Sequence, residues 1–493
     1  MSTPKALLLL LALVVASLGL SCNSEVVGPV FTPAKIGALY TYIGDSPACD
    51  VLGFRMNISG LKFRRTSNAE SFATIFPTNN TFVSLRLDFA ALRDTSTVMH
   101  FSTIQVDSYD RAELTLQLPK IVVYDTAVDP PIRVIDGVLS TAKPSIPLQP
   151  AFSVSDKTLN VLRFDFDMAK SLQLDTSGQV TKDIIPVFTA FPVPQAADKT
   201  YGTFDDLVGF ITQVSATSSG AFIGTFNLQM HSGTGQQIPI SVKPDTSLSG
   251  VPNLKSLETG RIAEVFARVD ASGNIVAEQV EMEDRSVVEE KRIAFFGTVL
   301  PTPVKDAMGN VTQLKLYLRA MEPDRSVEVL LDSVLTVNIP PGTAFQVSPR
   351  PDNLTPLQFG PTSITVGQEL LIHGQYTVVT DQPTVVDATS IYLRPQTLQG
   401  GLSSLISVGA DGKSGAFWLT GCSTLLQTTP IMVMTTNVDT AFINIFGLAE
   451  ILPQSPLYVR GFPFFVKDAT VIRGTPVPAG TLVLFATQVR QAA

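Results

Sequence analysis

The sequence predicts an all-β protein, and three observations support this fold class. Apolar and polar residues alternate with period two in many short runs, of which 112–118 (AELTLQL) is a clear example. Such alternation is typical of strands with one face turned inward. The 33 Gly and 34 Pro are spread along all 493 residues, so turn signals recur between the runs. Runs with helical period are few and short, the best being 89–93 and 287–292.

Residues 1–22 read as a secretory signal peptide. Lys5 precedes the apolar run 6–20, which is shorter than the roughly 20 residues that span a membrane. Cys22 follows the small residue Ser21, as in bacterial lipoprotein signals, although Gly19 stands where Leu is usual. We expect a lipid on Cys22, which would hold the chain on a membrane. Ordinary cleavage nearby and an uncleaved anchor are the alternatives.

The mature chain divides at three stretches whose composition suggests linkers: 191–199, 281–292 and the Gly/Ser-rich 396–404. After a tether at 23–35, we expect one β-sandwich and three small barrel-like (OB-like) modules. Their predicted bounds are 36–195 for the sandwich and 203–285, 292–396 and 404–490 for the modules.

The three modules are predicted to be copies of one unit, because short segments match between them. The matching pairs are 207–211 with 295–299, 259–267 with 366–374, 457–461 with 370–374, 415–419 with 224–228, and 275–280 with 482–489. Two turns share the pattern D-A-x-G-N, at 270–274 and 306–310, with a relative at 175–179. We expect hairpin turns there, in which Asp bonds backbone N–H groups and Gly supplies a positive φ. An EF-hand calcium loop would need more carboxylates.

Two parts of the chain resemble known families of bacterial envelope lipoproteins. The segments 44–50 (GDSPACD) and 162–172 (LRFDFDMAKSL) resemble the start and end of an uncharacterised N-terminal β-sandwich domain. The repeated modules resemble uncharacterised small β-barrels that occur in tandem after a lipoprotein signal, the third departing most, around 449–455. The resemblance implies a fold and a location in the envelope, and brings no activity or catalytic residue.

The chain offers little material for catalysis or nucleic-acid binding. A net charge of −8 disfavours a nucleic-acid partner. Three histidines (His100, His231 and His373) lack a G-x-S-x-G partner motif, and no C-x-x-C spacing suggests zinc. The sequence 412–414 (GKS) lacks the first glycine of a P-loop. We therefore predict no catalytic residue, no cofactor and no metal.

A few residues remain as weak candidates. Asp165 and Asp167 flank Phe166, so strand alternation places both carboxylates on one face, where they would bind Ca²⁺ or stay solvated. Trp418 is the single tryptophan and a candidate for a binding surface, since it alternates with Phe417. Cys49 and Cys422 are expected to be free buried thiols, and a bridge between them is the alternative.

These observations predict a non-enzymatic exported lipoprotein of the bacterial cell envelope, on the outer membrane or cell surface, that binds or scaffolds through its tandem β modules. Its expected partners are the membrane, through the lipid, and an unknown envelope protein or glycan. The alternative is a glycan-binding or glycan-active envelope protein, with or without a requirement for calcium. If Cys22 carries no lipid, we expect a secreted protein.

Overall fold

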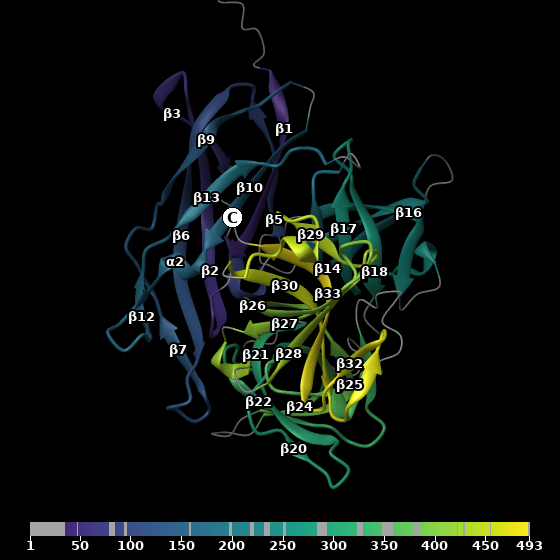
Figure 1. Cartoon of the computed structure of the whole chain (residues 1–493). Coiled ribbons are helices and arrows are strands. Elements are labelled where there is room, and N and C mark those ends of the chain that lie inside the picture. Colours follow the sequence, from purple (N-terminus) through teal and green to yellow (C-terminus); the bar gives the residue numbers. More distant parts are fainter. Residues whose placement is uncertain are drawn as a thin grey trace, which may run out of the picture.

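The computed structural model is a succession of one β-sandwich and three five-stranded barrels (Figure 1). The all-β prediction is confirmed. Within the described chain, no helix is both long and apolar enough to cross a membrane. The described residues are 35–46, 48–77, 84–92, 96–156, 159–196, 200–216, 221–230, 237–249, 253–282, 293–322, 329–347, 358–378, 384–421, 423–426, 429–453 and 455–491. The predicted signal with Cys22, and all of the predicted tether except Lys35, lie outside them.

The sandwich packs a four-stranded sheet, ordered β13-β10-β1-β5, against a sheet ordered β3-β2-β6-β7 in which β4 also pairs with β2 and β9 with β6. A small sheet, β11-β12-β8, lies at its side. Its elements are β1 (Ile36–Ser46), β2 (Val51–Arg65), β3 (Asn68–Phe76), β4 (Leu85–Asp88), the 3₁₀ turn η1 (Phe89–Leu92), β5 (Ser96–Gln105), β6 (Ser108–Tyr124), β7 (Ile132–Asp136), β8 (Val138–Leu139), β9 (Ser145–Ser153), β10 (Leu159–Asp167), α2 (Met168–Ser171), β11 (Leu172–Leu174), β12 (Val180–Ile184) and β13 (Phe188–Pro192).

The core of the sandwich is rich in phenylalanine. Phe166 of β10 is fully buried, and its ring centroid lies 5.1 Å from that of Phe54, 4.7 Å from that of Phe89 and 4.9 Å from that of Phe188. Strand alternation predicted that Phe166 would point inward between Asp165 and Asp167, and this is confirmed. Burying side chains of this size contributes about 1.5–3 kcal/mol each.

The barrels each close five main strands into a ring. The first barrel contains β14 (Thr203–Ala216), β15 (Gly224–Met230), β16 (Gln237–Ser249), η2 (Leu254–Ser256), β17 (Ile262–Val269) and β18 (Ile275–Met282). The second contains β19 (Ile293–Val299), β20 (Val304–Lys305), β21 (Val311–Glu322), β22 (Val334–Asn338), β23 (Ala344–Val347), η3 (Pro361–Ser363), β24 (Glu369–Thr377) and β25 (Val385–Leu393). The third contains β26 (Gln396–Val408), β27 (Gly415–Gly421), η4 (Thr424–Leu426), β28 (Ile431–Thr435), β29 (Ala441–Ile443), η5 (Leu448–Glu450), β30 (Leu457–Val466), β31 (Thr470–Ile472), β32 (Thr475–Val477) and β33 (Thr481–Gln491).

All three rings have the same topology. In strand order they run β14-β15-β16-β18-β17, β19-β21-β22-β25-β24 and β26-β27-β28-β33-β30, and in each the third and fifth main strands pair in parallel. The remaining neighbours in each ring are antiparallel. Every segment match found in the sequence joins equivalent strands, so the repeat is real. This five-stranded closure is that of OB-like barrels.

The third barrel begins earlier than its composition suggested. The Gly/Ser-rich run 396–404, expected to be a linker, belongs to β26, which pairs with both β27 and β30. Position 400 requires glycine for a steric reason, because a Cβ there would lie 2.3 Å from the carbonyl oxygen of Thr420. Gly209 and Gly297 occupy the same position in the first strands of the other barrels.

The D-A-x-G-N turns form as predicted. Asp270 accepts hydrogen bonds from the backbone N–H groups of Ser272 and Asn274, and Gly273 has a φ of 83°. Asp306 makes the equivalent bonds, so both sequences close hairpins. These carboxylates therefore serve the backbone of the turns.

The four units pack against one another through buried contacts. The outer face of sheet β13-β10-β1-β5 meets the first barrel, where the rings of Tyr42 and Phe204 lie 4.8 Å apart. Glu264 of the first barrel forms a buried ion pair with Arg394, which joins the second barrel to the third. A single hydrophobic cluster spans the second and third barrels. Figure 1 shows the sandwich in purple and blue beside the barrels, in teal to yellow.

Candidate functional site

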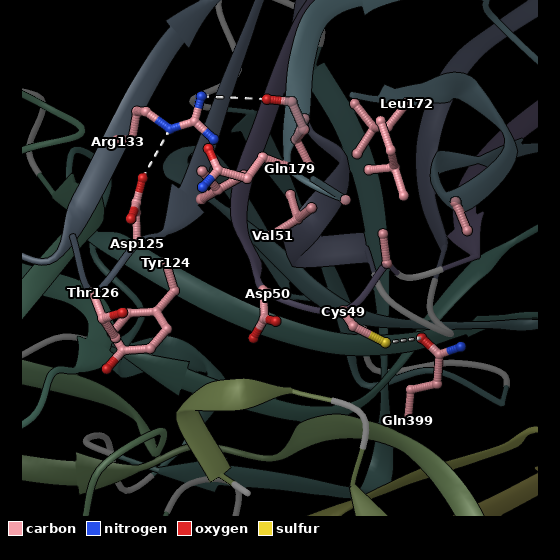
Figure 2. Close-up of a pocket in the computed structure, with 16 residues that line it drawn as sticks. Cys49, Asp50, Val51, Tyr124, Asp125, Thr126, Arg133, Leu172, Gln179 and Gln399 are labelled. Carbon is pink, nitrogen blue, oxygen red and sulfur yellow. Dashed lines mark hydrogen bonds and ion pairs between the residues drawn. The ribbon is translucent and has the colours of Figure 1, made fainter. Parts of the chain in front are cut away.

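A pocket of about 500 Å³ lies where the sandwich meets the third barrel (Figure 2). This volume is within the range of small-molecule sites. Its walls come from parts of the chain that are distant in sequence, and we call it the junction pocket. It is lined by Ala48, Cys49, Asp50, Val51, Val123, Tyr124, Asp125, Thr126, Arg133, Ala169, Leu172, Leu174, Gly178, Gln179, Val180 and Gln399.

The turn between β1 and β2 brings the two units together. Asp50 has a φ of 60°, a left-handed conformation that Asp tolerates better than most residues. Its carbonyl accepts a hydrogen bond from the N–H of Tyr124 at 2.9 Å. Its carboxylate accepts another from the hydroxyl of Ser423, also at 2.9 Å. The turn is thus held to β6 on one side and to the third barrel on the other.

The floor of the junction pocket is apolar. Val51, Val123 and Leu172 are buried there, at 1%, 4% and 7% exposure. Val51 and Val123 are neighbours across the β2–β6 ladder, while Leu172 begins β11 just after α2. A ligand in the pocket would therefore rest on aliphatic side chains.

The rim is polar. The Arg133 guanidinium pairs with the Asp125 carboxylate, with Nε and Oδ2 3.1 Å apart, and its Nη1 donates to the Val180 carbonyl at 3.3 Å. Burial, and secondarily the charge of Asp50, raises the pKa of Tyr124, so its hydroxyl stays protonated and able to donate at neutral pH. Figure 2 shows Tyr124, Gln179 and Gln399 on different sides of the opening.

Cys49 is disulfide-bonded, so the expectation of a free thiol there is wrong. Its sulfur also lies 3.7 Å from Oε1 of Gln399, which comes from the third barrel. A disulfide sulfur carries no proton, and this approach is a van der Waals contact. Cys422 lies outside the described residues. The error arose because the two sequence neighbourhoods were assigned to separate domains, whereas the units are packed together.

Asp165 and Asp167 contact basic neighbours. Asp165 lies 3.2 Å from the Arg163 guanidinium. Asp167 caps α2 by accepting the N–H of Lys170 at 3.0 Å, and pairs with the ammonium group of the same residue at 2.7 Å. No group of three or more His, Cys, Asp or Glu side chains suited to a metal occurs in the described part of the chain. The pair thus acts in local charge pairing and helix capping.

Trp418 lies on the outer face of the third barrel. Phe417 points into the barrel and is fully buried, so one of the two does face outward, as alternation predicted. The half-buried Trp418 packs against the cluster that spans the second and third barrels. It does not line the junction pocket.

His100 and His373 lie apart from the pocket. Burial lowers the pKa of His100, whose ring packs against Phe76 with centroids 5.1 Å apart. His373 is buried beside Tyr392, and its Nδ1 lies 3.2 Å from the Ser390 hydroxyl. His231 lies outside the described residues.

The pocket residues could not be found from the sequence. They come from the β1–β2 turn, the start of β2, the end of β6, β7, α2, the β11–β12 hairpin and β26, and no motif links these segments. Two segments carry a local signal, namely GDSPACD, which supplies Cys49 and Asp50, and the turn 175–179, which supplies Gly178 and Gln179. The first belongs to a family resemblance and the second to a predicted hairpin turn, and neither signal indicates a site.

Among known protein families, one matches a single module of this chain, and the similar solved structures share little sequence with it. Residues 208–281, inside the first barrel, match the family described as a domain of unknown function, DUF5666. No curated protein matches the chain. A solved structure of Drosophila Unr CSD456 is 11% identical, with 58% of this chain and 97% of that chain covered and a TM-score of 0.14.

The single-stranded DNA-binding protein of Thermus aquaticus is 14% identical, with 38% of this chain and 90% of that chain covered and a TM-score of 0.12. Such low TM-scores carry no argument about what this chain does. The barrel assignment follows from the strand order, and residues 208–281 are similar to a family without an assigned function.

Proposed function

We propose that this protein is an exported, lipid-anchored, non-enzymatic binding protein of the bacterial cell envelope, with the junction pocket as its binding site. The observation that carries the proposal is a pocket of about 500 Å³ that the sandwich lines and that Gln399 of the third barrel completes. The third barrel thus contributes one side chain to a site that the sandwich otherwise forms.

Export is supported by two independent features. The N-terminal residues have the pattern of a lipoprotein signal that ends at Cys22. A disulfide such as the one at Cys49 is typical of an oxidising compartment such as the periplasm or the cell surface. Each feature would be unusual in a cytosolic protein.

The pocket lies beyond the far end of β1 from the point where the described chain begins. The described chain enters at the start of β1, whose 11 residues extend about 35 Å to the turn that carries Asp50. In Figure 1, β1 enters at the top of the molecule. A lipid on Cys22 would anchor the chain through the residues that precede β1, whose first residue lies at the opposite end of the strand from the pocket.

A binding role without chemistry is supported by how the charged groups of the pocket are used. Asp125 pairs with Arg133 and also caps the N–H of Ala127, and Asp50 holds Ser423. These contacts tie the carboxylates to structural tasks, whereas an acid or base catalyst needs a carboxyl aimed at the substrate. The calcium-dependent alternative gains no support from Asp165 and Asp167, which contact Arg163 and Lys170.

The proposal is tested by mass spectrometry of the N-terminus of protein isolated from its own envelope, together with detergent fractionation. We expect an acylated Cys22 and partition into the detergent phase. The variant Cys22→Ser should remain in the aqueous phase. An unmodified N-terminus that begins elsewhere would refute the anchor, and turnover of any envelope substrate by the purified protein would refute the non-enzymatic role.

A further inference from the structure

We infer that the junction pocket binds a neutral saccharide. This inference rests on the proposed binding function and names the ligand class of the same site. It follows from three properties of the lining residues, namely their charge, their apolar floor and the chemistry of their rim.

Charge excludes anionic ligands. The lining contains two carboxylates, Asp50 and Asp125, against the single guanidinium of Arg133. That guanidinium is already neutralised by Asp125, whose Oδ2 lies 3.1 Å from its Nε. The whole chain carries a net charge of −8. A phosphate or carboxylate ligand would therefore meet a negative site with no unneutralised cation to bind it.

The apolar floor and polar rim together disfavour ligands that are wholly apolar and ligands that are wholly polar. A wholly apolar ligand would cover Tyr124, Gln179 and Gln399 without bonding them, at the cost of their lost hydration. A wholly polar ligand would leave the aliphatic floor of Val51, Val123 and Leu172 in contact with hydroxyl groups. A sugar ring carries C–H groups on its faces and hydroxyls around its edge, which suits an apolar floor with a polar rim.

The rim groups match hydroxyl partners. A sugar hydroxyl both donates and accepts, and an amide side chain does the same, so Gln179 and Gln399 can each bond two hydroxyls. Tyr124 adds a hydroxyl donor and an aromatic face, against which the C–H groups of a sugar can pack. Because these side chains come from opposite sides of the pocket, they would contact different edges of one ring.

The test is isothermal titration calorimetry of the full mature chain with short neutral oligosaccharides, uronate oligosaccharides and glucosamine oligomers. We expect binding of at least one neutral series, and at least about tenfold weaker binding of uronates of the same linkage. Gln179→Ala should weaken neutral binding about fivefold. Its matched control is Gln346→Ala, an exposed glutamine on β23, which should leave affinity unchanged.

A second pair of variants guards against effects on folding. Ala169 is exposed on α2 and lines the pocket, so Ala169→Phe should obstruct the pocket and abolish binding without loss of thermal stability. Ala344→Phe, at an exposed position of β23, should bind normally. Absence of neutral-saccharide binding, tighter binding of uronates or glucosamine oligomers, or equal affinity of Gln179→Ala and Gln346→Ala would overturn the ligand class.

Failure of the saccharide inference is distinguishable from failure of the proposed function. The anchor test on Cys22 does not depend on any ligand. Uronate binding that Ala169→Phe abolishes would keep the pocket as the binding site while removing neutral saccharides as its ligand.

Discussion

Arg55 of the sandwich and Asp332 of the second barrel form a buried ion pair, with Nη1 and Oδ2 2.7 Å apart. The two side chains are only 9% and 7% exposed. The Tyr317 hydroxyl donates to the other carboxylate oxygen at 3.0 Å, and Arg55 also donates to the Arg319 carbonyl. Both carboxylate oxygens and both terminal guanidinium nitrogens of the pair therefore have partners inside the interface, and the sandwich and barrel are fixed in one arrangement.

Breaking this pair should destabilise the protein strongly. Asp332→Asn leaves a buried guanidinium without its counter-charge, and we expect a loss of about 3–5 kcal/mol in the free energy of unfolding. Urea denaturation of the native chain and the variant measures this loss. Replacing both partners, as in Arg55→Met with Asp332→Leu, should recover only part of the loss, because no uncompensated guanidinium remains but the buried Tyr317 hydroxyl loses its acceptor.

The control for this prediction is the exposed pair Lys120–Asp136, whose side chains are 43% and 89% exposed. Asp136→Asn should change the free energy of unfolding by less than about 0.5 kcal/mol. If Asp332→Asn lowers the free energy of unfolding no more than Asp136→Asn does, the buried pair does not stabilise the interface as its burial indicates.

Adjacent glycines of β26 should respond in opposite ways to the same substitution. A Cβ on Gly400 would meet the Thr420 carbonyl oxygen at 2.3 Å, whereas a Cβ on Gly401 has nothing within 4 Å. We expect Gly400→Ala to cost about 1–3 kcal/mol by forcing β26 and β27 apart. Gly401→Ala should be neutral or slightly stabilising. Thermal unfolding measures both, and equal effects would contradict the close strand approach.

These glycines also show where sequence reasoning fails and why. A Gly/Ser-rich run has the composition of a linker, and only the neighbouring strand, 20 residues further along the chain, explains why a side chain cannot be present. The equivalent glycine of the first barrel lies between Val208 and Phe210, that of the second follows Phe295 and Phe296, and the sequence predicts strands at both. Flanking hydrophobicity, and not the glycine, carried the signal.

Local patterns predicted the strands, the turns and the repeat, because each depends on residues close together in sequence. The contacts between units depend instead on residues that are far apart in sequence. Arg55 and Asp332 are separated by 277 residues, and no local pattern in the sequence indicates that they pair. The junction pocket has the same origin, so its residues were missed while Asp165 and Trp418, which stand out locally, were singled out.

Acidification should remove the contribution of the turn carboxylates to stability. The Asn310 side-chain amide, followed by the backbone N–H groups of the turn, lowers the pKa of Asp306 below 3.8. A carboxyl with a lowered pKa in the folded state contributes stability above the unfolded value of 3.8, which is lost as the pH falls through the folded value. The stability difference between the native chain and Asp306→Ala should be constant from about pH 5 to 8 and shrink below about pH 4.

Asn310→Ala is the companion variant, because it removes the largest cause of the shift. NMR titration of the Asp306 carboxyl should then give a pKa closer to 3.8 than in the native chain. An unchanged titration in Asn310→Ala would show that the side-chain bond does not act on Asp306.

The disulfide at Cys49 should join the sandwich to the third barrel. The chain has only two other cysteines, Cys22 and Cys422. Gly421 and Ser423, the sequence neighbours of Cys422, line the same cleft as Cys49 and Asp50, and Ser423 donates to Asp50. We therefore expect peptide mapping without reduction to recover a peptide with Cys49 linked to one with Cys422. This pairing would leave Cys22 as the one thiol available for a lipid.

Loss of that bond should destabilise the chain and loosen the pocket wall to which Cys49 belongs. We expect Cys49→Ser to cost about 2–4 kcal/mol, the usual contribution of a disulfide. Reduction of the native chain should have the same effect, while Cys22→Ser should leave stability unchanged. A cross-link from Cys49 to Cys22 would contradict both the lipid anchor and the covalent tie, since the residue proposed to carry the lipid would then be consumed by the disulfide.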